Sequence, residues 1–239
     1  LMKRGCRSPR RASLPLARYI TPSLAPPLAA VHNGAPGRAY PMLGNDVHSD
    51  CVEAAGLHAV QDWAGPSILL PTEAQALADY TVAAGYVAAN PATDNGTDPS
   101  QYMAAWAKGL PGAGKIAGFV QLDPADATQM QLAIQHFGGV LFCAELPDMA
   151  EDVARWFQGT CIGQPGGGHA VWINGYDGLR YDIVTWGQYR PASMDHAFAT
   201  FYGFAGYAAV PQDWMTPGRA PAGIDQSRLL ADLARVGAI

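Results

Sequence analysis

The order of the local structure signals constrains the fold of this chain more than any other feature of its sequence. Helix starts and helical spacing of apolar residues fill much of the first half of the 239 residues, and apolar runs of strand length follow in the second half. Asp177-Gly178 separates two of these runs and is typical of a tight antiparallel hairpin. Helices followed by antiparallel strands indicate an α+β fold rather than a doubly wound parallel sheet.

Four helix starts are expected before residue 140. Asp50-Cys51-Val52-Glu53 has the pattern of a capping box, in which the Asp50 side chain accepts a hydrogen bond from the Glu53 N–H. Apolar residues at helical spacing then follow up to Trp63. The other starts are Thr72-Glu73-Ala74-Gln75, Asp98-Pro99-Ser100-Gln101 and Asp123-Pro124, with ends expected near Gly85 for the first of these and near Gly138 for the last.

The second half of the chain alternates strands with two further helices. The expected strands are Ile116–Leu122, Val140–Leu146, His169–Tyr176, Arg180–Trp186 and Tyr207–Val210. A short helix is expected around Asp195–Tyr202, and a last helix over Asp225–Val236.

Charge sets the N-terminal segment apart from the rest. Residues 1–45 carry seven of the 15 Lys and Arg residues and no acid, so the remainder, with eight basic and 20 acidic residues, has a net charge of −12. Nucleic-acid binding by such a body is not expected, whereas the basic segment could contact an acidic protein partner. We expect a basic extended arm in solvent at 1–40, a folded body at 41–215, and a C-terminal tail with a helix at 216–239.

A secretory signal and a membrane span are not expected in this sequence, whereas the Arg-rich, acid-free N-terminal segment leaves an organelle transit peptide open as an alternative. No stretch approaches the roughly 18 apolar residues of a membrane span. The basic segment also lacks the continuous apolar stretch of a secretory signal.

Cys51 is the strongest candidate for a reactive group. With Asp50 as N-cap, Cys51 occupies the first helical position, where the helix dipole and free N–H groups stabilise a thiolate. The general base must come from elsewhere, because His58 lies two turns along the same helix, about 10 Å away. His169 follows three glycines, Gly166–Gly168, which allow close approach of a substrate. We therefore pair Cys51 with His169, and a structural histidine is the alternative.

Three motifs resemble those of papain-like cysteine peptidases. Gly44-Asn45-Asp46-Val47-His48-Ser49-Asp50-Cys51 resembles the nucleophile region of the family, and Gly167–Tyr176 (GGHAVWINGY) resembles its histidine strand. Ile183–Gly187 (IVTWG) is similar to the segment that reads Asn-Ser-Trp-Gly in the family. The order and intervening lengths agree over about residues 38–215, and short bacterial and phage-encoded papain-like proteins resemble the chain most closely.

The resemblance implies a fold and three roles. A helical half with a long central helix headed by Cys51 would pack on an antiparallel half-barrel that carries His169, with the site in the cleft between them. Cys51 would attack a carbonyl as a thiolate, and His169 would hold the ion pair and protonate the leaving group. Asn45 would supply an oxyanion-hole amide where the family has the longer Gln.

The third catalytic position departs from the family pattern. The Asn that orients the His in the family corresponds to Val184, which cannot form a hydrogen bond with an imidazole. Asp182 lies two residues earlier on the same strand face and is expected to take this role, whereas Thr185 is expected to face the other way. Trp186 is expected to shield the His from solvent.

The resemblance leaves three functions open. The first is a thiol protease or related hydrolase that cleaves a peptide, an isopeptide or a peptidoglycan crosslink, a chemistry that needs no metal or cofactor. The second is a weak or inactive structural or binding protein of the same fold, for instance in a phage virion, which Val184, Asn45 and the basic arm favour. The third is a transglutaminase-like acyl transferase. The expected location is the cytoplasm or a virion, and rapid alkylation of Cys51 with Cys143 spared would favour an enzyme.

Overall fold

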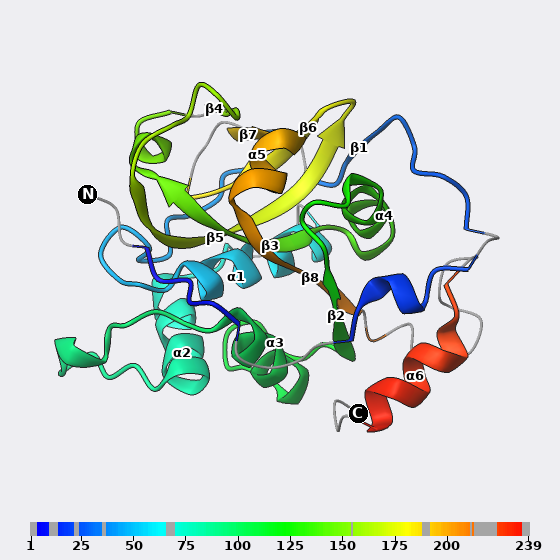
Figure 1. Cartoon of the computed structure of the whole chain (residues 1–239). Coiled ribbons are helices and arrows are strands. Elements are labelled where there is room, and N and C mark those ends of the chain that lie inside the picture. The colour runs from blue at the N-terminus through cyan, green and yellow to red at the C-terminus, as the bar shows by residue number, and fades with distance from the viewer. Residues whose placement is uncertain are drawn as a thin grey trace.

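A sheet of eight strands forms the centre of the computed structural model (Figure 1), which describes residues 4–9, 14–21, 24–34, 37–65, 70–153, 155–187, 192–210, 212 and 224–235. The strands follow the order β2-β8-β3-β5-β6-β7-β4, and β1 pairs with β5 off this path. All pairs are antiparallel except β4 with β7, and the sheet is not closed. The strands are β1 (Ala30–His32), β2 (Gly118–Leu122), β3 (Val140–Pro147), β4 (Arg155–Trp156), β5 (Pro165–Asp177), β6 (Arg180–Val184), β7 (Ala192–Asp195) and β8 (Gly203–Val210).

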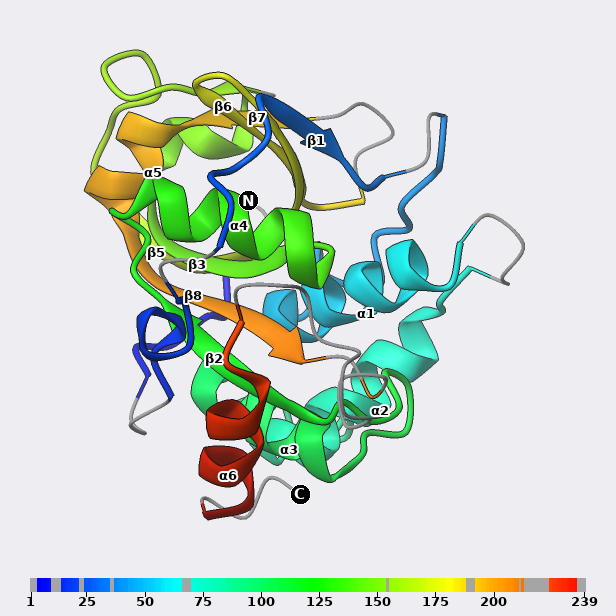
Figure 2. The ribbon, with the colours of Figure 1, turned by 90° about the vertical axis from the view of Figure 1, so that its right-hand side faces the viewer.

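Helices cover both faces of this sheet (Figures 1 and 2). The α-helices are α1 (Cys51–Trp63), α2 (Glu73–Ala84), α3 (Pro99–Lys108), α4 (Ala127–Phe137), α5 (His196–Tyr202) and α6 (Gln226–Arg235). Short 3₁₀ helices are η1 (Leu16–Arg18), η2 (Pro91–Thr93) and η3 (Asp148–Glu151). Alternation along β3 separates two cores: Leu141 and Cys143 pack with α1 and α3, whereas Val140 and Phe142 pack with α4 and α5. The chain therefore has the expected α+β architecture.

Most of the local signals are confirmed. Thr72 forms a complete capping box with Gln75, and Asp98 caps α3 with Pro99 at its first position. The hairpin at Asp177-Gly178 joins β5 to β6. The last two helices also lie where they were expected.

Two helix starts differ from the expectation. Asp50 precedes α1, but its side chain makes no capping hydrogen bond, so the predicted capping box with Glu53 is wrong. Helix α4 begins at Ala127 rather than at Pro124, because the Asp126 carboxylate accepts from the Gln129 N–H and is the N-cap.

The expectation of a solvent-exposed arm is wrong for the described residues between 14 and 20. Leu14, Leu16 and Tyr19 are buried members of the core beside α4. The C-terminal helix α6 lies alongside this segment (Figure 2), where the Tyr19 hydroxyl donates to Asp232 at 3.0 Å. The segment is therefore part of the folded body. Of the expected tail, residues 216–223 and 236–239 lie outside the described residues.

Among the described residues, no helix has the length and apolar character that crossing a membrane requires.

Candidate active site

Cys51 is the first residue of α1 and only 1% of it is exposed. Burial raises the pKa of its thiol well above the ordinary range, although the backbone N–H groups of Ala170 and Gly5 act in the opposite direction. Ala170 directly follows His169 on β5, so the start of α1 meets the sheet beside the expected base. Helix α1 also packs against β5 along its length. The backbone that follows His169 thus lies beside the Cys51 sulfur, whereas the His169 ring packs against Trp156 and Trp186.

His169 lies in β5 with 1% of its surface exposed. Its Nε2 lies 2.8 Å from the Thr185 hydroxyl, and the Trp186 ring stacks on the imidazole with 4.2 Å between centroids. Its Nδ1 is buried without a hydrogen-bond partner among the described residues. Burial, and to a lesser extent the charge of Arg4, lowers the pKa of this imidazole to about 3. The ring is fixed on one side and has a free nitrogen on the other.

Asp182 does not orient His169, which corrects the expectation from the sequence. Its carboxylate instead lies 2.6 Å from Nδ1 of His32 at a partly exposed site. Thr185 takes the expected place of Asp182 because β6 ends at Val184 and the alternation of faces ends with it. The backbone then turns through Trp186, whose φ of 45° is left-handed. The signal that could have identified Thr185 is its position one residue before this tryptophan.

Asn45 lies in the turn before α1 and is 2% exposed. Its side-chain amide lies beside the buried Asp50 carboxyl and acts to lower the pKa of that group by hydrogen bonding. The expected oxyanion-hole donor is therefore directed at Asp50.

Two carboxyl groups are buried under the start of α1, which the sequence did not predict. Burial, followed by the neighbouring Glu53, raises the pKa of Asp50 well above its usual range. Burial also raises the pKa of Glu53 to about 8, although the Thr97 hydroxyl donates to it at 2.7 Å. Glu53 is therefore mostly neutral at pH 7 and adds little negative charge beside the Cys51 sulfur.

Residues 4–7 of the chain itself cover Cys51. The Cys6 N–H donates to the Gly168 carbonyl at 2.9 Å, and the Thr97 N–H donates to the Gly5 carbonyl at 2.6 Å. A Cβ on Gly5 would lie 1.9 Å from the Ser49 carbonyl oxygen, so the segment fits closely. In Figure 1 this segment, in dark blue, crosses in front of α1. The N-terminal segment therefore covers the Cys51 sulfur, which is not exposed in an open cleft.

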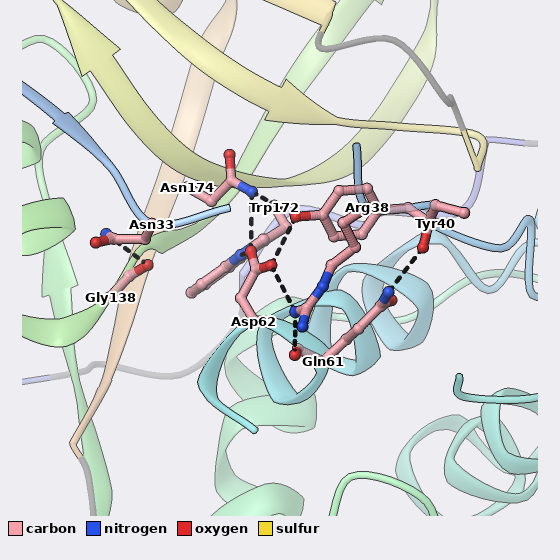
Figure 3. A network of polar contacts seen from close by, with 9 residues as sticks. Asn33, Arg38, Tyr40, Gln61, Asp62, Gly138, Trp172 and Asn174 are labelled. Carbon is pink, nitrogen blue, oxygen red and sulfur yellow. Dashed lines mark hydrogen bonds and ion pairs between the residues drawn. The ribbon is translucent and has the colours of Figure 1, made fainter. Parts of the chain in front are cut away.

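A polar network fixes the opposite end of α1 to the sheet (Figure 3). The Asp62 carboxylate accepts hydrogen bonds from Trp172 and Asn174 of β5, each at 2.8 Å. It also accepts from the Tyr40 hydroxyl at 2.6 Å and forms an ion pair with Arg38 at 3.3 Å. Because its partners come from β5 and from residues 38–40, Asp62 fixes the end of α1 to the strand that carries His169.

Metal ligands do not gather in the described part of the chain. Among those residues, no three or more His, Cys, Asp and Glu side chains are placed to hold a metal ion.

Comparison with solved structures gives extensive matches at low sequence identity. Xylellain, a cysteine protease from Xylella fastidiosa, is 14% identical, with a TM-score of 0.64 over 88% of this chain and 96% of that one. The fold is papain-like. Digestive procathepsin L 3 of Tenebrio molitor larval midgut is 14% identical, with a TM-score of 0.62 over 87% of this chain and 76% of that one.

A third match comes from a plant enzyme. The cysteine protease CMS1MS2 of Carica candamarcensis, solved in complex with E-64, is 14% identical, with a TM-score of 0.55 over 77% of this chain and 99% of that one. No protein-family model matches the sequence, and no curated protein sequence matches it. These structures therefore establish the papain-like fold of the chain.

Proposed function

We propose that this chain is a cysteine hydrolase that cleaves amide bonds in peptides, with Cys51 as nucleophile and His169 as general base. The observation that carries the proposal is the state of the imidazole. Thr185 fixes its Nε2, Trp186 covers its face, and its Nδ1 is unpartnered beside the residue whose N–H reaches the Cys51 sulfur. A purely structural histidine has no need of a free buried nitrogen.

The chemistry follows from this arrangement. Nε2–H donates to the Thr185 hydroxyl, which leaves the Nδ1 lone pair to accept the thiol proton. The Cys51 thiolate attacks the substrate carbonyl carbon, the C–N bond breaks, and the imidazolium protonates the leaving amine. Water then gives its proton to His169 and attacks the thioester, which releases the acid and restores the thiol. The Cys51 N–H stabilises the oxyanion, and the Asn45 amide would add a second donor on turning from the Asp50 carboxyl to the substrate oxygen.

The structure corresponds to a closed state of this enzyme. Burial under residues 4–7 disfavours both the thiolate and the imidazolium, and the Arg4 charge also disfavours the imidazolium. The segment presents the Gly5 N–H to the sulfur rather than a carbonyl carbon, so it is not itself positioned for attack. Departure of the segment would readmit water and remove the Arg4 charge, so the pKa of His169 would rise and that of Cys51 would fall.

A second candidate is the inactive structural or binding protein, as in a phage virion. The near-complete burial of Cys51 favours it, because a permanently closed site has no use for a nucleophile.

Hydrolysis by the full-length chain separates these candidates. Fluorogenic peptides are incubated with the unmodified chain and with Arg4→Ala, which weakens the covering segment. We expect cleavage that increases in Arg4→Ala, disappears in Cys51→Ala and requires no added metal. If Arg4→Ala exposes Cys51 to alkylation but no peptide is cleaved, and Cys51 reacts as an ordinary thiol with a pKa near 8.5, the structural candidate is correct.

A further inference from the structure

Arg4 occupies a built pocket for a guanidinium group. One terminal nitrogen donates to the Leu146 carbonyl at 3.0 Å, and the other donates to the Pro147 carbonyl at 3.3 Å. The second nitrogen also lies 3.1 Å from the Glu151 carboxylate, and the Arg4 side chain is only 6% exposed. Two carbonyls and one carboxylate therefore converge on a planar cation.

The wall of this pocket is made by the first glycine of the run before His169. A Cβ at Gly166 would lie 1.7 Å from an Arg4 terminal nitrogen and 3.1 Å from the Asp148 carboxylate. A larger residue at position 166 would therefore fill the place of the guanidinium. Space for the guanidinium is therefore a second reason for glycine at position 166, in addition to the close approach that the glycine run allows.

The pocket lies next to the proposed nucleophile. The N–H directed at the Cys51 sulfur belongs to Gly5, so the Arg4–Gly5 amide lies against that sulfur. The Arg4 charge also reaches His169, where it adds to the effect of burial in lowering the imidazole pKa. The same residue, Arg4, thus places its side chain in the pocket and its C-terminal amide beside the Cys51 sulfur.

We propose that this pocket selects substrates, and that the open enzyme binds and cleaves peptides with an arginine side chain beside the scissile amide. The inference rests on the proposed function, since the pocket would serve the same site once residues 4–7 have left it. The Nε donor of Arg4 is buried without a partner, so the chain's own arginine does not satisfy all of its hydrogen bonds there. The charge of −12 on residues 46–239 also attracts cationic peptides.

Binding tests the pocket without turnover. Full-length Arg4→Ala/Cys51→Ala is titrated with two fluorescent octapeptides that differ only in arginine or citrulline, which has nearly the same shape but no charge. We expect the arginine peptide to bind at least tenfold more tightly. Adding Glu151→Gln should remove most of this difference. Adding Asp152→Asn, which removes an exposed carboxylate one residue along, should leave the difference in place.

The outcomes separate the pocket from the hydrolase. Equal binding of the two peptides, or binding of neither, overturns the pocket. Hydrolysis is measured separately in Arg4→Ala with Cys51 intact: equal cleavage of both peptides refutes arginine selection and leaves the hydrolase standing. Preferential binding without any cleavage refutes the hydrolase and keeps the pocket. If Arg4→Ala does not fold, Arg4→Gln, which keeps the stem of the side chain, takes its place.

Discussion

The Arg4→Ala substitution should open the site locally without unfolding the protein. Arg4 contributes a largely buried ion pair with Glu151 and two hydrogen bonds to carbonyl groups. Breaking a buried pair by removing one partner costs about 3–5 kcal/mol. With the lower figure, the population in which residues 4–7 have left the cleft rises roughly 100-fold, since about 1.4 kcal/mol corresponds to a factor of ten.

Alkylation of Cys51 measures this population. The full-length protein is treated with iodoacetamide, and modification of each cysteine is followed over time by peptide mass spectrometry. We expect the rate at Cys51 to rise about 100-fold in Arg4→Ala, given the loss of about 3 kcal/mol. Cys143 contacts Cys6 of the covering segment, so it cannot report global unfolding, which is followed instead by amide hydrogen exchange in α4 on the other face of the sheet. This exchange should stay unchanged.

Arg7→Ala is the matched control within the same segment. Arg7 donates to the Asn95 carbonyl at 2.7 Å in an exposed position, so its loss costs about 1 kcal/mol and should raise the rate about fivefold. Equal rates in the two variants would show that the buried ion pair does not hold the segment. Amide exchange in α4 that accelerates in step with Cys51 alkylation would show global unfolding instead, and either result refutes the reasoning.

Three further predictions concern residues around the site. Thr185→Val leaves the His169 Nε2 without a partner, which should lower the free energy of unfolding by about 1–3 kcal/mol. Peptide cleavage in the Arg4→Ala background should fall about tenfold, and its pH profile should change. Thr185→Ser should restore the cleavage rate and the pH profile. Asp62→Ala leaves four buried or half-buried donors without their acceptor and should lower the free energy of unfolding in urea by about 3 kcal/mol. An unchanged urea midpoint would contradict the role of Asp62 in fixing α1. Because the pKa of Glu53 is about 8 rather than its usual 4.5, the folded state binds more protons than the unfolded state between these pH values, and stability should fall as the pH rises through them. In Glu53→Gln the urea midpoint should depend less on pH between pH 6.5 and 8. An unchanged pH dependence of the midpoint would contradict this assignment.

Local signals predicted the parts of the fold that depend on neighbouring residues. The capping pattern at Thr72 and the turn at Asp177-Gly178 act within four residues, and the structure forms both. Short pairings such as β4 with β7 were not predicted, because two-residue strands have no periodicity of their own. The capping box at Asp50 failed because its backbone, with φ of −103° and ψ of 25°, lies outside the extended region that N-cap residues typically adopt.

Motifs indicated candidate site residues, but not the contacts made where the backbone departs from regular structure. Cys51 and His169 were proposed from a helix start, a glycine run and the resemblance of their motifs, and their pairing stays a prediction. The contact of Thr185 with His169 depends on the end of a strand and a left-handed residue, which the rule of alternating faces does not describe. The pocket of Arg4 depends on a hydrogen bond to the Leu146 carbonyl, 142 positions along the chain, so no local sequence pattern indicated it.

The bond between Tyr19 and Asp232 has a consequence for biosynthesis. It joins residues 213 positions apart, and the Cys6 N–H likewise needs Gly168. A ribosome adds about 5–20 residues per second, from the N-terminus onward. At this rate the 162 residues that follow Cys6 up to Gly168 take roughly 10–30 seconds to make, so the Cys51 sulfur stays without its cover during that interval.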